Sequence, residues 1–149
     1  MAIVLPKFPR RRLSARRLKR AVEPALGLRL LSLQPRLEPL ELLEFEYSLR
    51  RVEFADVDRL EVSVVWQTEG KGSEDFGVHY FESLNGAELA RAFEDGPKSV
   101  STTLPANPLT YSGHLLSIKW CIRLRLYMND NREIAAEQPF YLGHLTVDV

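Results

Sequence analysis

The chain has 149 residues, of which 45% are hydrophobic and 27% are charged, and this composition is typical of one soluble globular domain. No apolar run approaches the roughly 20 residues of a membrane-spanning helix, and the apolar start over residues 1–5 lacks the preceding basic residues of a secretory signal. The single cysteine, Cys121, excludes an internal disulfide and a cysteine-based zinc site, so we expect a reducing, cytoplasmic location.

The formal net charge is zero, but the charges are unevenly distributed along the chain. Residues 1–20 contain eight Lys or Arg and no acidic residue, whereas residues 38–95 contain fifteen Asp or Glu and five Lys or Arg. We therefore divide the chain into a basic N-terminal segment, residues 1–24, and a body, residues 25–149. The basic segment is either a short helix or a flexible arm, because mutual repulsion makes an isolated helix marginal there.

From residue 26 onwards the apolar residues follow the period of β-strands. Alternating side chains predict strands over residues 26–33, 43–49, 60–66, 76–81, 99–104, 116–128 and 134–140, with a short last strand over residues 145–149. Residues 54–58 predict a turn or a single helical turn, and residues 87–93 predict one or two helical turns within a connection. The strand over 76–81 is predicted to place three side chains on one face, Phe76, Val78 and Tyr80, and two on the other, His79 and Phe81.

The longest predicted strand carries the clearest alternation. Seven apolar residues from Leu116 to Met128 occupy one face, and the polar residues between them occupy the other. The sequence over 129–131 predicts a hairpin turn, and Pro139 predicts an edge or a bulge in the returning strand because it lacks an N–H donor. Seven or eight strands without helix–strand alternation predict an all-β fold, a two-layer antiparallel sandwich of immunoglobulin-like type.

The residues that lead into this strand resemble the arrestin superfamily. Residues 104–113 contain two prolines that hold the lead-in extended, followed by an aromatic–x–glycine turn at Tyr111 and Gly113, and Trp120 lies at the matching place in the long strand. The resemblance implies an arrestin-like sandwich with an adaptor or scaffold role. Arrestins have two sandwiches and a buried ionic cluster, whereas this chain has room for one sandwich and no match to the cluster, so specific partners do not carry over.

Three cations lie on the polar face of the long strand: Lys119, Arg123 and Arg125. Two hypotheses account for them. They either form cross-strand ion pairs with an acidic strand such as that of Glu44 and Glu46, or they form a docking surface for an acidic or phosphorylated partner.

The basic N-terminal segment is the second candidate binding region. It is either solvated, or docked on the body or on a neighbouring copy, or in contact with nucleic acid or an anionic membrane. The candidate residues are Arg10, Arg11, Arg12, Arg16, Arg17, Lys19 and Arg20.

Metal-binding patterns are weak. The three histidines, His79, His114 and His144, are far apart and lack the spacing of metal ligands. The loop over residues 69–75 contains three carboxylates and is either a solvated turn or a site for a hard cation such as calcium. We expect no resident metal and no cofactor.

Catalytic patterns are also weak. Cys121 is either a packing residue or, with Arg123 nearby, a thiol of lowered pKa, and no hydrolase or phosphate-binding motif accompanies it. We therefore predict a non-catalytic protein-binding adaptor or scaffold, with a homodimer through a strand edge as one mode of binding. The alternative function is an anion-surface binder that uses the basic segment, and the third hypothesis is an enzyme of unrecognised type.

Overall fold

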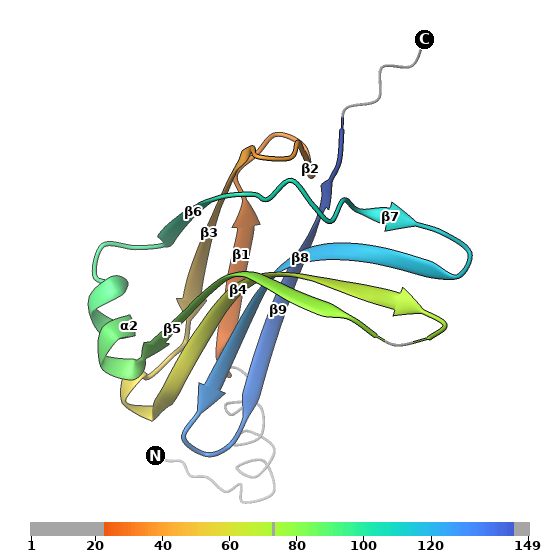
Figure 1. Cartoon of the computed structure of the whole chain (residues 1–149). Coiled ribbons are helices and arrows are strands. Elements are labelled where there is room, and N and C mark those ends of the chain that lie inside the picture. Colours follow the sequence, from red (N-terminus) through yellow and green to blue (C-terminus); the bar gives the residue numbers. More distant parts are fainter. Residues whose placement is uncertain (1–22, 73, 145–149) are drawn as a thin grey trace, which may run out of the picture.

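Strands make up most of the computed structural model, which describes residues 23–72 and 74–144. The elements are β1 (Ala25–Leu30), β2 (Arg36–Leu37), β3 (Leu42–Arg50), η1 (Phe54–Asp56), β4 (Val57–Gly70), β5 (Phe76–Asn85), α2 (Gly86–Ala92), β6 (Lys98–Thr103), β7 (Tyr111–Ser112), β8 (Leu116–Met128) and β9 (Glu133–Leu142). The smaller sheet has the order β1-β3-β6, and the larger sheet has the order β2-β9-β8-β4-β5 (Figure 1).

The two sheets confirm the predicted all-β sandwich. Every described pairing is antiparallel except that of β2 with β9, which is parallel over two residue pairs. In the larger sheet the whole of β8 pairs with β4 on one side. On its other side β8 pairs with β7 near its start and with β9 from Trp120 onwards. The predicted long strand over 116–128 is therefore a central strand of the larger sheet.

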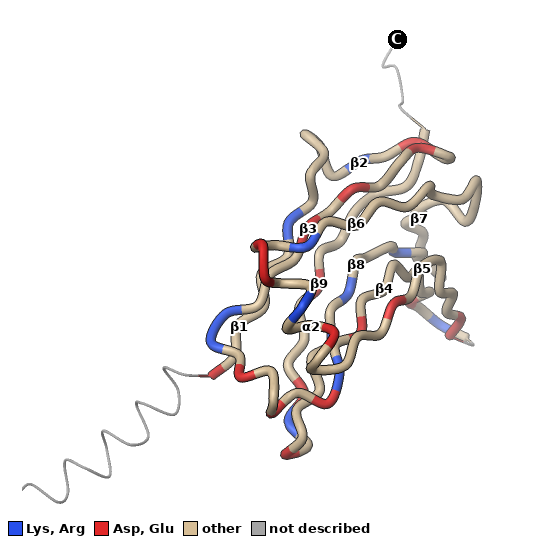
Figure 2. Tube along the Cα trace, turned by 90° about the vertical axis from the view of Figure 1, so that its left-hand side faces the viewer, with Lys and Arg blue, Asp and Glu red and all other residues tan. Residues whose placement is uncertain are grey.

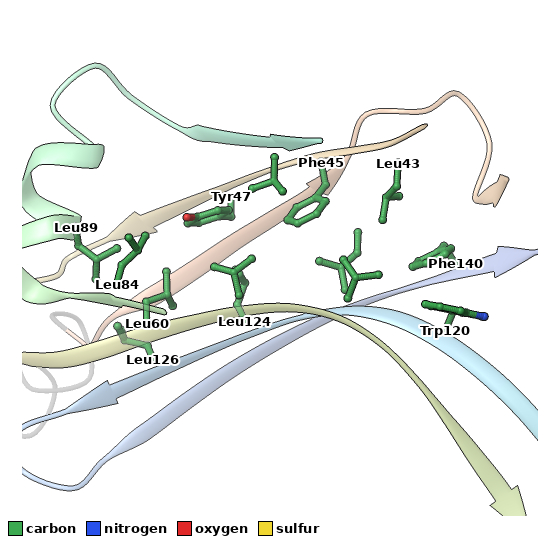
Figure 3. Close-up of a cluster of buried hydrophobic side chains, with 14 of the residues drawn as sticks. Leu43, Phe45, Tyr47, Leu60, Leu84, Leu89, Trp120, Leu124, Leu126 and Phe140 are labelled. Carbon is green, nitrogen blue, oxygen red and sulfur yellow. The ribbon is translucent and has the colours of Figure 1, made fainter. Parts of the chain in front are cut away.

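The core lies between the inner faces of the two sheets (Figure 3). Because side chains alternate along a strand, every second residue of β3, β4 and β8 points into this layer. Fully buried members include Phe45, Leu60, Ile122 and Leu124. Trp120 closes one end of the core against Phe140, with their ring centroids 5.8 Å apart.

The lead-in to β8 is fixed to the core through Trp120. The indole Nε1 of Trp120 donates a hydrogen bond of 2.8 Å to the carbonyl oxygen of Pro108, which holds the lead-in against the sheet. A side chain at Gly113 would collide with the ring of Tyr111, 2.6 Å from its Cε1. Glycine is needed there for close packing of the aromatic–x–glycine turn.

Helix α2 carries the chain from the larger sheet to the smaller one. A capping box begins it: Glu88 N–H donates to Asn85 Oδ1 at 2.9 Å, and Asn85 N–H donates to Glu88 Oε1 at 3.0 Å. Leu89 anchors the helix in the core with no exposed surface. The connection β5–α2–β6 leaves β5 at the border of the larger sheet.

A β-bulge in β5 corrects the predicted faces of that strand. Val64 of β4 pairs with Tyr80 and Val65 pairs with Val78, so His79 is an extra residue on β5. The extra residue reverses the alternation from that point. Tyr80 consequently faces the core side, and Phe81 lies on the same outer side as Val78, contrary to the prediction.

The other predicted elements have mixed outcomes. The helical turns near residues 54–58 and 87–93 are confirmed by η1 and α2, and the hairpin turn is confirmed with Asn131 at a φ of 70°. Pro139 lies where β9 pairs with β8 alone, because β2 reaches only the last two residues of β9, so the predicted edge position is confirmed. The predicted strand over 145–149 and nearly all of the basic segment lie outside the described residues.

Replacement of Leu124 by alanine tests the core. Leu124 is fully buried, so we expect Leu124→Ala to lower the free energy of unfolding by about 2–5 kcal/mol through lost burial and the cavity that remains. Leu33→Ala is the control, because Leu33 is fully exposed and its loss should change stability by less than about 0.5 kcal/mol. Urea unfolding followed by circular dichroism measures both, and equal stabilities of the two variants would contradict this core.

Candidate functional site

The outer face of the larger sheet, turned away from the smaller sheet, carries a row of exposed apolar side chains. These are Phe76, Val78 and Phe81 of β5, here called the β5 row, which are 50%, 53% and 56% exposed. Val65 of β4 and Cys121 of β8 continue the apolar surface inward from Val78, since the three residues are directly paired across the strands. The β5 row is thus the rim of an apolar band that crosses the sheet.

Strand β5 is also an edge strand. Within residues 23–72 and 74–144 it pairs with β4 alone, so its other side presents backbone N–H and C=O groups to no neighbouring strand (Figure 1). Edge strands are commonly protected by outward charges, but the outward positions from Phe76 to Ser83 carry none. The bulge at His79 is the protective feature that remains.

The inner side of β5 is polar near the smaller sheet. Tyr80 Oη donates to Glu82 Oε2 at 3.4 Å, and Lys98 Nζ of β6 lies 3.5 Å from Glu82 Oε1. Lys98 and Glu82 form an ion pair, yet Glu82 Oε1 is buried and has no hydrogen bond. Burial, followed by the nearby charge of Glu82, raises the pKa of both Tyr80 and the fully buried Tyr47. Polar contacts on this inner side therefore connect β5 of the larger sheet to β6 of the smaller sheet.

Ion pairs with neighbouring strands hold the three cations of β8. Lys119 Nζ lies 2.9 Å from Glu69 Oε2, Arg123 Nε 3.8 Å from Glu137 Oε1, and Arg125 Nε 3.7 Å from Glu133 Oε1. Acidic and basic positions are accordingly intermixed over the described trace in Figure 2. The pairs of Lys119 and Arg125 are solvent-exposed and contribute about 0–1 kcal/mol each, so they neutralise the face more than they stabilise it, whereas the Arg123 side chain is only 13% exposed.

The predicted acidic partners of these cations were wrong. Glu44 and Glu46 lie on β3 of the smaller sheet, where Glu46 pairs with Arg29 at 2.6 Å. The neighbours of β8 are β4 and β9, and both carry glutamates at positions that match the cations. The structure therefore contains the cross-strand ion pairs of the first hypothesis, but the partners are glutamates of β4 and β9.

Burial makes Cys121 a poor nucleophile. Cys121 is 9% exposed on the outer face, and desolvation raises the pKa of its thiol to about 11, with a smaller contribution from Glu137. Arg123 opposes this shift only weakly. The Sγ–H donates to Glu137 Oε2 at 3.5 Å. The structure thus favours the packing role over the reactive thiol.

The histidines are separate from one another. His79 Nε2 lies 3.2 Å from Thr102 Oγ1, and its ring packs edge-on against Trp120. His144 Nδ1 lies 3.5 Å from Glu38 Oε2, whereas His114 is exposed. In the part of the chain that the structure describes, no group of three or more His, Cys, Asp or Glu side chains is arranged to hold a metal ion.

The acidic loop between β4 and β5 does not gather its carboxylates. Glu69 is engaged by Lys119, which lowers the pKa of Glu69, while Asp75 Oδ1 accepts a hydrogen bond of 2.9 Å from Phe76 N–H. Thr68 Oγ1 accepts a further bond of 2.6 Å from Asp75 N–H. These contacts favour the solvated turn over the cation site.

A polar depression of about 410 Å³ lies beside the β8–β9 turn and was not predicted from the sequence. Its two cations are already engaged. Arg59 stacks on the ring of Tyr127 at 3.9 Å and pairs with Asp58 and with Glu61, and Arg132 pairs with Asp130 at 2.8 Å. Because the charges are neutralised locally, the depression offers little to an anionic ligand.

The seven candidate cations of the basic segment lie outside the described residues, so the structure does not place them. Among residues that it does place, no helix is both long and apolar enough to cross a membrane.

The sequence did not predict the β5 row, because the bulge that brings Phe81 to the same face as Val78 cannot be recognised from the alternation of residues 76–81. The available signal was the density of apolar residues in that strand.

Comparison with known proteins supports the fold. No protein-family model matches the sequence, and no curated protein is significantly similar to it. Among solved structures, the chain is similar to Spo0M, a sporulation control protein from Bacillus subtilis, with a TM-score of 0.54 and 8% sequence identity. The match covers 82% of this chain and 50% of the other, so the chain spans about half the length of the solved Spo0M chain. At this identity the likeness concerns the fold alone, and that fold is arrestin-like.

Proposed function

We propose that this chain is a non-catalytic protein-binding module of adaptor or scaffold type and that it binds through the edge of β5. The observation that carries the proposal is the β5 row: three large apolar side chains, about half exposed, on a strand whose outer edge pairs with no other strand of the described residues. Contiguous exposed apolar surface commonly marks an interaction site in a protein that is otherwise well packed.

Strand addition is the mode of binding that fits this edge. An extended segment placed beside β5 accepts and donates main-chain hydrogen bonds, and its alternate side chains cover Phe76, Val78 and Phe81. Full burial of such a side chain contributes about 1.5–3 kcal/mol, so each half-exposed member of the β5 row has about 1 kcal/mol left to gain. Backbone pairing supplies affinity, and the apolar row supplies selectivity.

The chemistry of the remaining groups supports a non-catalytic role. Catalysis requires ionisable groups with perturbed pKa values gathered around a pocket. Here the thiol of Cys121 is protonated at neutral pH, and the carboxylates near β8 are engaged in ion pairs. The polar depression beside the β8–β9 turn has its cations neutralised.

A charge placed in the β5 row tests the binding site. We expect Phe81→Lys to keep the fold, because Phe81 is exposed, and to weaken capture of the partner at least about tenfold, since a buried lysine opposes an apolar contact. Leu33→Lys is the matched control on a fully exposed leucine remote in sequence from β5. Affinity capture from the source cells with quantitative mass spectrometry compares wild type and both variants. A partner retained equally by Phe81→Lys would contradict the proposed site.

The thiol offers a test of the non-catalytic proposal. Because the folded pKa of Cys121 is raised to about 11, its contribution to stability is complete below the unfolded pKa of about 8.5 and is lost as the pH rises toward 11. We expect wild type to lose more stability than Cys121→Ser over that window. We also expect iodoacetamide to alkylate the native chain slowly at about pH 8, where the thiol is protonated. Native alkylation as fast as that of the urea-unfolded chain would show a reactive thiol instead.

The basic segment favours a second candidate function, the binding of an anionic surface. Its eight cations and lack of acids are the supporting observation. If all eight contacted phosphate groups of duplex DNA, log K would fall with log salt at a slope of about −7. Deletion of residues 1–20 should abolish that binding, whether the surface is a DNA duplex or a vesicle of anionic lipid. Salt-independent binding, or binding that survives the deletion, would remove this candidate.

A further inference from the structure

We infer that the β5 edge is occupied by β5 of a second copy of this chain, with the two strands antiparallel about a two-fold axis centred on the bulge. This inference rests on the proposed function, because it names the partner of the same edge. The result is one continuous sheet that crosses both copies and leaves neither β5 edge open.

Charge is the first argument for a second copy. Identical strands that meet about a two-fold axis bring like residues near one another, so outward charges on β5 would repel. The outward residues from Phe76 to Ser83 are uncharged, and the formal net charge of the chain is zero. Low net charge favours association over mutual repulsion.

Register is the second argument. The bulge exchanges the faces of β5 between Val78 and Tyr80, so regular self-pairing across it must match residues from opposite sides of the bulge. An axis between His79 and Tyr80 places Val78 opposite Phe81 of the second copy, both on the outer face. It also makes the two bulges coincide, so the distortion that protects an isolated edge is shared by both strands.

The outer face of the junction gains the most apolar contact. Each copy contributes Phe76, Val78 and Phe81, which together form one apolar strip across the two strands. Cross-strand apolar pairs of this kind stabilise a sheet by about 0.2–1 kcal/mol each, in addition to the burial of their surface. The β5 row is thus complementary to itself.

The mass of the full chain in solution provides the first test. We expect sedimentation equilibrium to show a concentration-dependent rise from the monomer mass to the dimer mass over about 1–200 µM. Phe81→Lys should weaken the dimer at least about tenfold because it places two cations at the junction, whereas Leu33→Lys should leave it unchanged. A monomer at every concentration, or a dimer that Phe81→Lys leaves intact, overturns the inference.

Crosslinking tests the register. In a Cys121→Ser background, Val78→Cys combined with Phe81→Cys should form disulfide-linked dimers, because the two positions face each other across the axis. Within one strand they are about 10 Å apart, which is too far for an internal disulfide. Each single variant should crosslink poorly. Efficient crosslinking by Phe81→Cys alone would overturn the axis on the bulge.

The failure of this inference is distinguishable from that of the proposed function. A chain that stays monomeric but loses a captured protein on Phe81→Lys overturns the second copy and leaves a different partner at the same edge. A dimer that resists Phe81→Lys, together with capture that also resists it, overturns both.

Discussion

The antiparallel pairing of β4 with β8 is the constraint on which the rest of the structure depends. The two strands are hydrogen-bonded along the whole of β8, from Leu116 to Met128, and each faces the core with every second residue. Once their register is set, Trp120 reaches the lead-in carbonyl of Pro108, and the cations of β8 meet glutamates on β4 and β9. A shift of one residue would turn the buried leucines outward and the arginines into the core. The register of this one pairing therefore determines which residues of the larger sheet face the core and which face solvent.

The bulge at His79 is the local exception to that regularity, and it determines the character of the outer face. If β5 paired with β4 in regular alternation throughout, Tyr80 would share the outer face with Phe76 and Val78, and Phe81 would point toward the core. With the bulge, Phe81 joins Val78 on the outside, and Tyr80 joins Glu82 near Lys98. The bulge thus places the exposed apolar residues of β5 on one face and the polar residues next to β6 on the other.

Sequence pattern predicted most of the fold but only part of the candidate site. The alternation from Leu116 to Met128 and the asparagine-rich turn after it are local signals, so both were predicted correctly. Pairing partners are non-local: nothing in Lys119 or Arg123 indicates that Glu69 and Glu137, instead of the glutamates of β3, lie beside them. The bulge was not predicted for a similar reason: it is a shift in the pairing register of β5 with β4, and the sequence of neither strand alone indicates it. The likeness to Spo0M covers 82% of the chain but concerns the fold alone, so it carries no information about the role of the β5 edge.

The order of the strands along the chain has a consequence for how the molecule is made. Strand β4 is synthesised well before β8, and β5, α2, β6 and β7 lie between them. Pairing between distant segments is slow to form because a long loop must close first. During that delay β4 has only β5 beside it, and a two-stranded hairpin is marginally stable in water. The apolar residues of the nascent hairpin are thus open to neighbouring chains before the core assembles, which makes this stretch an aggregation hazard during folding.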